Sequence, residues 1–192
     1  MISMRRSRPF QDVPDQIEIE LAPGAEGNFQ TLEVMRQVAR LRSTAPLVRT
    51  TAVSVVNPVA QNDNVGEVTA IASWVRSSMK YRFDPADQEQ LTDPLTLLDQ
   101  IARGVPTYSS DCDDMSLLTA TLLLSLGYGD IYFCAVRYDP NANEQDSFDH
   151  VYTVAYVKDK DTGKTVRIPL DCILSAPIGS EVTSASKVEY AI

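Results

Sequence analysis

Apolar residues recur along the first half of the chain at the three- and four-residue spacing of helices that bury one face. This spacing predicts helices over residues 28–43, 64–79 and 94–103. Residues 46–56 remain open, because proline at the first position suits a helix, whereas the valines at the end of the segment suit a strand. The first half of the chain is therefore predicted to be mainly helical.

One further helix is apolar on nearly every side. It is predicted over residues 112–126, between Asp111 and Gly127. Aspartate is a good N-cap because its carboxylate accepts a hydrogen bond from a free N–H of the first turn. Glycine just past the last turn lets the chain leave in a left-handed conformation. A helix without a polar face is typical of a buried central position.

Cys112 lies at the N-terminal tip of this predicted central helix. The free N–H groups of a helix N-terminus favour a thiolate, but Asp111, Asp113 and Asp114 place negative charge beside it. A nucleophilic Cys112 therefore needs a cationic neighbour. His150 is the single histidine of the chain, so the position of His150 decides whether Cys112 has one.

The second half of the chain changes to a period of two. Alternating apolar and polar residues predict strands over residues 131–138, 150–157 and 165–171, with an earlier strand at 16–21. Pro169 indicates an edge strand or a bulge. Helices that precede consecutive strands are typical of an α+β fold with an antiparallel sheet.

Composition narrows the class of protein. The chain has 192 residues and a net charge of −9; we expect an extended arm over residues 1–16 and a single domain over residues 17–192. The negative charge argues against a nucleic-acid partner, and the sequence has no apolar run long enough to span a membrane. Three cysteines without CxxC spacing favour neither a disulfide framework nor a zinc cluster. We therefore expect a cytoplasmic protein without a nucleic-acid or membrane partner.

The predicted sheet brings a histidine and an aspartate together. If strands 150–157 and 165–171 form an antiparallel pair, His150 at the start of the first lies beside Asp171 at the end of the second. Both residues would then face the helix tip that carries Cys112. An imidazole can take the thiol proton, and a carboxylate can hold the imidazole in the required tautomer. The three residues are therefore a candidate catalytic triad.

Several segments around these residues resemble the transglutaminase-like superfamily, in particular its bacterial and phage-encoded branch. The resemblance spans about residues 64–175 and is carried by Trp74-Val75, Tyr81-Arg82-Phe83-Asp84-Pro85, Asp111-Cys112-Asp113-Asp114, Gly127-Tyr128, Asp149-His150-Val151-Tyr152 and Pro169-Leu170-Asp171. It implies a papain-like fold with Cys112 as nucleophile, His150 as general base and acid, and Asp171 as orienting residue. Ser110 departs from the glycine often found there, and Cys172 has no assigned role.

The resemblance implies a cysteine hydrolase or acyltransferase that acts on amide bonds of a peptide or protein through a thioester. Because some members of the superfamily have lost activity, the alternative is a non-catalytic binding or structural component, for example of a phage particle. Residues 1–16 and the tail after Pro177 could then contact neighbouring phage structural proteins. An enzyme needs an accessible thiolate, whereas a structural component does not.

A thioester mechanism needs donors for the oxyanion. The backbone N–H of Cys112 is one, and Tyr81 and Tyr108 are candidates for a second. Trp74 falls on a helical apolar face and is expected in the core.

The aspartates beside Cys112 allow two interpretations. In the first, Asp111 caps the helix and Asp114 supports its first turn, and no cofactor is needed. In the second, Asp111 and Asp113 bind calcium, since the acidic residues resemble those of calcium-dependent bacterial transglutaminase-like cysteine proteinases and Ca²⁺ takes carboxylate oxygens.

Overall fold

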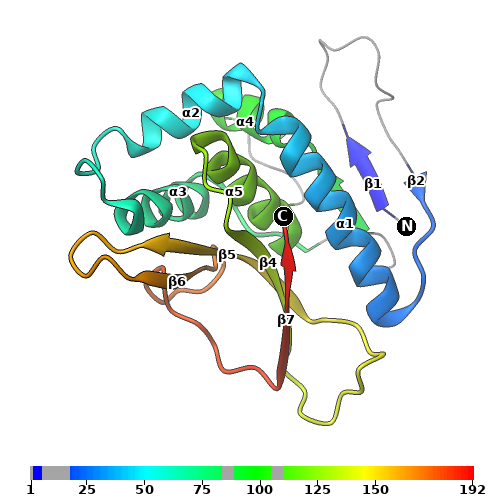
Figure 1. Ribbon diagram of the computed structural model, residues 1–192. Coiled ribbons are helices and arrows are strands. Elements are labelled where there is room, and N and C mark those ends of the chain that lie inside the picture. The colour runs from blue at the N-terminus through cyan, green and yellow to red at the C-terminus, as the bar shows by residue number, and fades with distance from the viewer. Residues whose placement is uncertain (1, 6–17, 84–88, 105–109) are drawn as a thin grey trace.

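The computed structural model describes residues 2–5, 18–83, 89–104 and 110–192. A layer of helices covers one face of an antiparallel sheet (Figure 1). The helices are α1 (Gly24–Arg42), α2 (Pro46–Val56), α3 (Asn64–Ser78), α4 (Pro94–Ala102) and α5 (Cys112–Leu126). The predicted α+β class, with helices first and consecutive strands second, is confirmed.

The helix ends follow local sequence rules with one exception. Pro46 occupies the first turn of α2, and the open choice for this segment is settled as a helix. Helix α1 begins at Gly24, four residues before the predicted start. A Cβ at Gly24, whose φ is +66°, would lie 2.2 Å from the carbonyl oxygen of Gln145. The start of α1 at Gly24 therefore depends on a contact with the distant loop around Gln145, and the spacing of apolar residues cannot predict such a contact.

Helix α5 is the predicted central helix. Asp111 caps it by accepting a hydrogen bond from the N–H of Asp113 at 3.2 Å, and Gly127 ends it with a φ of +98°. The helix packs against α1, α2, α3 and α4 on its sides and against β5 (His150–Lys158) below. Its leucines from 117 to 123 are fully buried, so the helix forms the centre of the core.

The main sheet has the strand order β6-β5-β4-β7 and is antiparallel throughout. It consists of β4 (Ile131–Arg137), β5, β6 (Thr165–Leu170) and β7 (Ser186–Ala191). Pro169 lies in β6, at one edge of the sheet, as its missing N–H predicts. Strand β7 was not predicted, although Lys187-Val188-Glu189-Tyr190 alternates polar and apolar residues; its pairing partner β4 lies about fifty residues away in sequence.

A smaller sheet with the order β2-β1-β3 lies beside α1 (Figure 1). Strand β1 (Ile2–Arg5) pairs antiparallel with β2 (Glu18–Ile19) and parallel with β3 (Glu89–Thr92). Strand β3 was not predicted from the sequence. Leu91 of β3 is buried and Thr92 bonds to α5, and neither contact is local. Within the described residues, no helix combines the length and apolar character needed to cross a membrane.

Candidate active site

Helix α5 and strand β5 are joined by two buried hydrogen bonds next to the candidate residues. The Ser116 hydroxyl donates to the carbonyl oxygen of Val151 at 3.1 Å, and the Thr153 hydroxyl donates to the carbonyl oxygen of Ser116 at 2.9 Å. Ser116 lies one turn after Cys112, and Val151 directly follows His150. These bonds therefore set the tip of the helix against the start of the strand.

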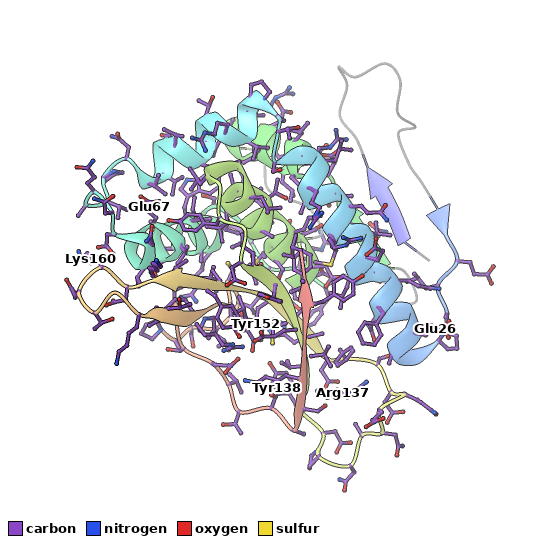
Figure 2. The ribbon with its side chains drawn as sticks, viewed as in Figure 1. Glu26, Glu67, Arg137, Tyr138, Tyr152 and Lys160 are labelled. Atoms are coloured by element: carbon purple, nitrogen blue, oxygen red, sulfur yellow. The ribbon has the colours of Figure 1, made fainter. Side chains whose placement is uncertain are left out.

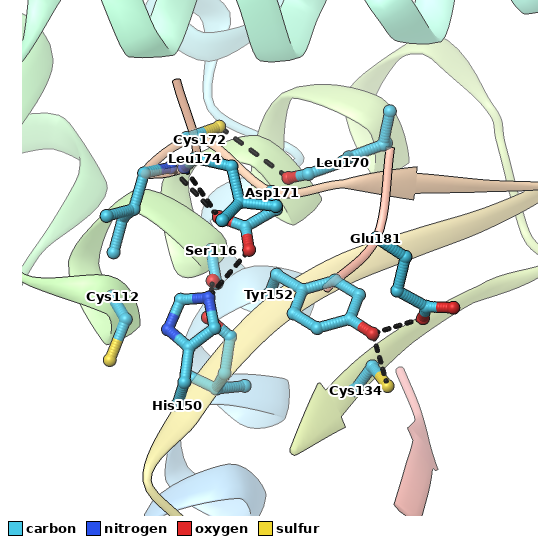
Figure 3. A network of polar contacts seen from close by, with 12 residues as sticks. Cys112, Ser116, Cys134, His150, Tyr152, Leu170, Asp171, Cys172, Leu174 and Glu181 are labelled. Atoms are coloured by element: carbon cyan, nitrogen blue, oxygen red, sulfur yellow. Dashed lines mark hydrogen bonds and ion pairs between the residues drawn. The ribbon is translucent and has the colours of Figure 1, made fainter. Parts of the chain in front are cut away.

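His150 and Asp171 meet as the antiparallel pairing predicts. The Nε2 atom of His150 lies 2.8 Å from Oδ2 of Asp171, whose side chain is 4% exposed (Figure 3). The other carboxylate oxygen of Asp171 accepts hydrogen bonds from the N–H groups of Ile173 (2.9 Å) and Leu174 (3.4 Å). Burial raises the pKa of Asp171, but the His150 contact and these two N–H groups outweigh it and hold the pKa below its usual value.

Arg76 of α3 holds the turn that carries Asp171. Its guanidinium donates to the carbonyl oxygens of Asp171 at 2.7 Å and Ala176 at 2.9 Å. The next residue, Cys172, packs between α3 and α5, where its thiol donates to the carbonyl oxygen of Ala72 at 3.4 Å. Burial raises the pKa of Cys172 to about 11, so Cys172 acts as a core residue. Sequence reasoning missed Arg76 because nothing local relates it to Asp171.

Cys112 and His150 line the same pocket, which has a volume of about 220 Å³. In Figure 3 the second ring nitrogen of His150, Nδ1, lies on the side of the ring nearer Cys112. The Cys112 thiol, however, donates to Oδ1 of Asp113 at 3.2 Å, and no hydrogen bond joins it to His150 among the described side chains. Cys112 and the His150–Asp171 pair are thus brought to one pocket without a thiol–imidazole bond.

The pKa of Cys112 is raised well above its ordinary value. Burial is the largest cause, followed by the negative charges of Asp113 and Asp111, and the N–H of Val151 opposes them only in part. The negative charges of Asp113 and Asp111 therefore oppose the formation of a thiolate at Cys112. Burial and the two carboxylates all favour the protonated form of the thiol.

The His150 ring is enclosed by aromatic side chains. The Tyr138 ring stacks near it with centroids 6.5 Å apart, and the Tyr152 ring lies at 5.7 Å. The Tyr152 hydroxyl donates to Glu181 and accepts from the Cys134 thiol at 3.3 Å (Figure 3). Cys134 is fully buried and contacts Tyr152, so we assign it to the core and not to the pocket. These contacts restrict the His150 ring.

Helix α1 supplies a wall of the pocket that the sequence did not predict. The side-chain oxygen of Asn28 accepts a hydrogen bond from the N–H of Phe148 at 2.9 Å, which joins α1 to the loop before His150. Arg137 and Tyr138, labelled in Figure 2, lie where β4 ends and this loop begins. The remaining lining residues are Thr31, Leu32, Met35, Tyr81, Phe83, Asp111, Asp113, Ala135, Asp149 and Val151.

One of the two tyrosine candidates for the oxyanion can be placed. Tyr81 lines the pocket, and its ring packs edge-on against Phe83 with centroids 5.0 Å apart. Tyr108 lies outside the described residues. Trp74 is half-buried and packs against the main core, as expected from its helical face.

Among the described residues, the acidic group around Cys112 supplies only part of the ligand set that Ca²⁺ takes. One ligand atom each from Asp111, Cys112 and Asp113 lies within 4.8 Å of the others, but Ca²⁺ takes six to eight oxygen ligands and this group includes a thiol. Both oxygens of Asp114 accept hydrogen bonds from Thr92, at 2.7 Å from its N–H and 3.1 Å from its hydroxyl. Asp114 lies in the first turn of α5, as expected, and also joins α5 to β3.

The family comparison agrees with this arrangement. A family described as a transglutaminase-like domain matches residues 50–160, which is more than half of the chain. The chain therefore belongs to the transglutaminase-like domain family. The matched segment includes Cys112 and His150 and ends before Asp171. No curated protein matches the chain.

Two solved structures are similar to the chain. A "putative cysteine protease" from Cytophaga hutchinsonii is 17% identical, with a TM-score of 0.43 over 75% of this chain. A "putative protease" from Parabacteroides distasonis is 13% identical, with a TM-score of 0.46 over 92% of this chain. The chain spans 40% of the length of each of these proteins.

Proposed function

We propose that the protein is a cysteine hydrolase or acyltransferase that acts on amide bonds of a peptide or protein. In this proposal Cys112 is the nucleophile, His150 is the general base and acid, and Asp171 orients His150. The observation that carries it is the 2.8 Å contact between His150 and Asp171 on the pocket that Cys112 also lines. A carboxylate bound to one ring nitrogen leaves the other to exchange a proton with a thiol.

The first half of the reaction transfers the acyl group to the enzyme. The Cys112 thiol rotates away from Asp113 and passes its proton to Nδ1 of His150. The thiolate attacks the amide carbon, and the carbonyl electrons move to oxygen. The C–N bond then breaks as His150 returns the proton to the departing amine, which leaves a thioester on Cys112. A hydrogen bond that forms only in the substrate complex is common in such sites.

The second half releases the acyl group from Cys112. His150 takes a proton from water in a hydrolase, or from an amine in an acyltransferase, and the attacking oxygen or nitrogen displaces the thiolate. The backbone N–H of Cys112 belongs to the first turn of α5 and has no helical carbonyl partner. It is the first donor for the oxyanion, and we propose the Tyr81 hydroxyl as the second.

The test is acylation of the enzyme by p-nitrophenyl acetate, which needs no knowledge of the natural substrate. Release of p-nitrophenol gives the rate, and mass spectrometry identifies the acylated cysteine. We expect acylation of Cys112, with a rate reduced about 10²- to 10⁴-fold in His150→Ala. The buried Cys134 and Cys172 are internal controls. Acylation that is absent, or indifferent to His150, would overturn the proposal and favour a binding or structural protein.

A further inference from the structure

The face of the main sheet that points away from the helices carries a cluster of its own. Side chains alternate along β5, so residues 151, 153, 155 and 157 face α5, whereas His150, Tyr152 and Tyr156 lie on the opposite face. A second apolar cluster, separate from the main core, lies on that opposite face and consists of Cys134, Val136, Tyr152 and Val154. Val136 is paired with His150 across β4 and β5. His150 therefore begins its strand directly beside this second cluster.

Tyr152 is the member of the cluster whose ring contacts His150. The two ring centroids are 5.7 Å apart and the planes meet at 34°, within the usual range of 4.5–7 Å for aromatic pairs. Tyr152 is 3% exposed, whereas Tyr138, the other ring near His150, is 41% exposed and lies at 6.5 Å. Because a buried ring moves less than one in solvent, Tyr152 is the firmer of the two contacts.

The Tyr152 hydroxyl is anchored by Glu181. It donates to Oε1 of Glu181 and accepts from the Cys134 thiol (Figure 3). Glu181 also accepts hydrogen bonds from Arg167 at 2.8 Å and from Lys187 at 3.1 Å. Burial raises the pKa of Glu181, but its three donors outweigh burial and lower the pKa to about 2. Glu181 is therefore an ionised acceptor for Tyr152 at neutral pH.

Both supports of His150 come from the segment between β6 and β7. Asp171 begins this segment and contacts the ring directly, whereas Glu181 lies later in it and acts through Tyr152. The hydrogen bond from Nε2 to Asp171 fixes one atom of the imidazole. The direction of Nδ1 depends also on the plane of the ring, which a single hydrogen bond does not set. A second contact is needed to fix that plane.

We propose that Tyr152 and Glu181 are positioning residues for His150, an inference that rests on the proposed function. The Tyr152 ring sets the plane of the imidazole, and Glu181 holds Tyr152 in place. Nδ1 is thereby kept on the side of Cys112, where the proposed reaction needs it. Neither Tyr152 nor Glu181 lines the pocket, so both act through His150.

Strand β5 offers a matched control, because it carries a second tyrosine–glutamate pair on the same face. The Tyr156 hydroxyl donates to Oε2 of Glu189 at 2.8 Å, and Nε of Arg167 donates to the same carboxylate at 2.7 Å. The side chains of Glu181 and Glu189 are 26% and 23% exposed. Tyr156, however, lies six residues from His150, which is about 20 Å along an extended strand. The two pairs share their chemistry and differ in their distance from His150.

Acylation by p-nitrophenyl acetate measures the effect on the proposed reaction. We expect Tyr152→Phe and Glu181→Ala to slow acylation of Cys112 about tenfold, since small displacements of a catalytic group reduce the rate strongly. Tyr156→Phe and Glu189→Ala should change it less than about twofold. Glu181→Gln keeps an acceptor for Tyr152 and should recover most of the rate. A thermal melt of each variant shows that it is folded at the temperature of the assay.

Nuclear magnetic resonance tests the same proposal at the imidazole, without any substrate. His150 is the single histidine of the chain, so its ring ¹⁵N signals are assigned without ambiguity. In the neutral imidazole, the contact with Asp171 should place the proton on Nε2 and give two well-separated ¹⁵N shifts. We expect Tyr152→Phe and Glu181→Ala to bring these shifts closer together, because a freer ring samples both tautomers, and the two control variants to leave them unchanged.

The two measurements separate the positioning role from the proposed function. If acylation depends on His150 but Tyr152→Phe and Glu181→Ala match their controls, the enzyme stands and the positioning role is wrong. Slower acylation with unchanged ¹⁵N shifts would also overturn it, because the loss would not act through the imidazole. If acylation is indifferent to His150→Ala, the proposed function itself fails, whatever the ¹⁵N shifts show.

Discussion

The two sides of the candidate site differ in how far their hydrogen bonds already hold the side chains in the arrangement that the proposed reaction needs. On the β5 side, His150 contacts Asp171, Asp171 is bonded to two further N–H groups, and Arg76 holds its turn. On the α5 side, the Cys112 thiol is bonded to Asp113, and burial, followed by the negative charges of Asp113 and Asp111, raises the pKa of Cys112. The proposed acid–base pair is therefore preorganised, whereas the proposed nucleophile is bonded to a carboxylate.

Replacing Asp171 should give the largest effect on activity. In Asp171→Asn the carboxylate that orients His150 is lost, and we expect acylation of Cys112 to slow by about 10²- to 10⁴-fold. The rate of p-nitrophenol release measures this. A decrease of less than about threefold in the acylation rate would mean that the His150–Asp171 pair does not activate Cys112.

The same variant has a stability signature. The folded pKa of Asp171 is below its unfolded value, so its contribution to stability is present above the unfolded pKa near 4 and disappears as the pH falls through the folded pKa. Asp171→Asn should therefore lower the free energy of unfolding at pH 7 and have little effect near pH 2. Urea unfolding at both pH values checks this, and an equal loss at both would contradict the linkage.

The assembled side is also the part that the sequence predicted best. The antiparallel pairing that joins His150 to Asp171 follows from alternating residues in two consecutive strands, and Asp111 and Gly127 mark the ends of α5 by local capping rules. These signals lie within a few residues or in neighbouring elements. Local chemistry was therefore sufficient for most of the helices and for the contact between His150 and Asp171.

What the sequence did not reveal depends on distant contacts. Arg76 reaches Asp171 across 95 positions, and Asn28 reaches Phe148 across 120. Strand β7 pairs with the edge of β4, and its short alternating pattern, Lys187-Val188-Glu189-Tyr190, does not specify this distant partner. The Cys112 thiol donates to Asp113, and the spacing of residues in the sequence does not encode this side-chain orientation.

Replacing Arg76 is a second way to disturb the His150–Asp171 pair, because Arg76 holds the turn that carries Asp171. In Arg76→Leu the part-buried carbonyl oxygens of Asp171 and Ala176 lose their donors, at a cost of about 1 kcal/mol in the free energy of unfolding. We expect acylation to slow about tenfold because the Asp171 turn loosens. Arg49→Leu is the matched control, since Arg49 donates to the carbonyl oxygen of Ser125 at the far end of α5. It should lower stability without slowing acylation; equal slowing in both variants would remove the special role of Arg76.

Asp113→Asn changes the α5 side of the site and should increase the reactivity of Cys112, whereas the preceding variants reduce it. Removing the charge that raises the pKa of Cys112 lowers that pKa, so the rise of alkylation rate with pH shifts to lower pH. We expect alkylation by iodoacetamide at pH 8 to accelerate about threefold to tenfold. Rates from pH 6 to 11, with modified cysteines assigned by mass spectrometry, measure the shift. An unchanged profile would show that burial alone suppresses the thiol.

Removing divalent cations should have the smallest effect. Asp111 and Asp113 form a group with a thiol, and both oxygens of Asp114 accept from Thr92, so the donors at the α5 tip do not match the oxygen shell of Ca²⁺. Excess EDTA should leave the melting temperature and the acylation rate unchanged within error, and added calcium should not raise either. If EDTA lowered the melting temperature or the acylation rate and calcium restored it, the prediction would be wrong and a metal would be assigned to Asp111 and Asp113.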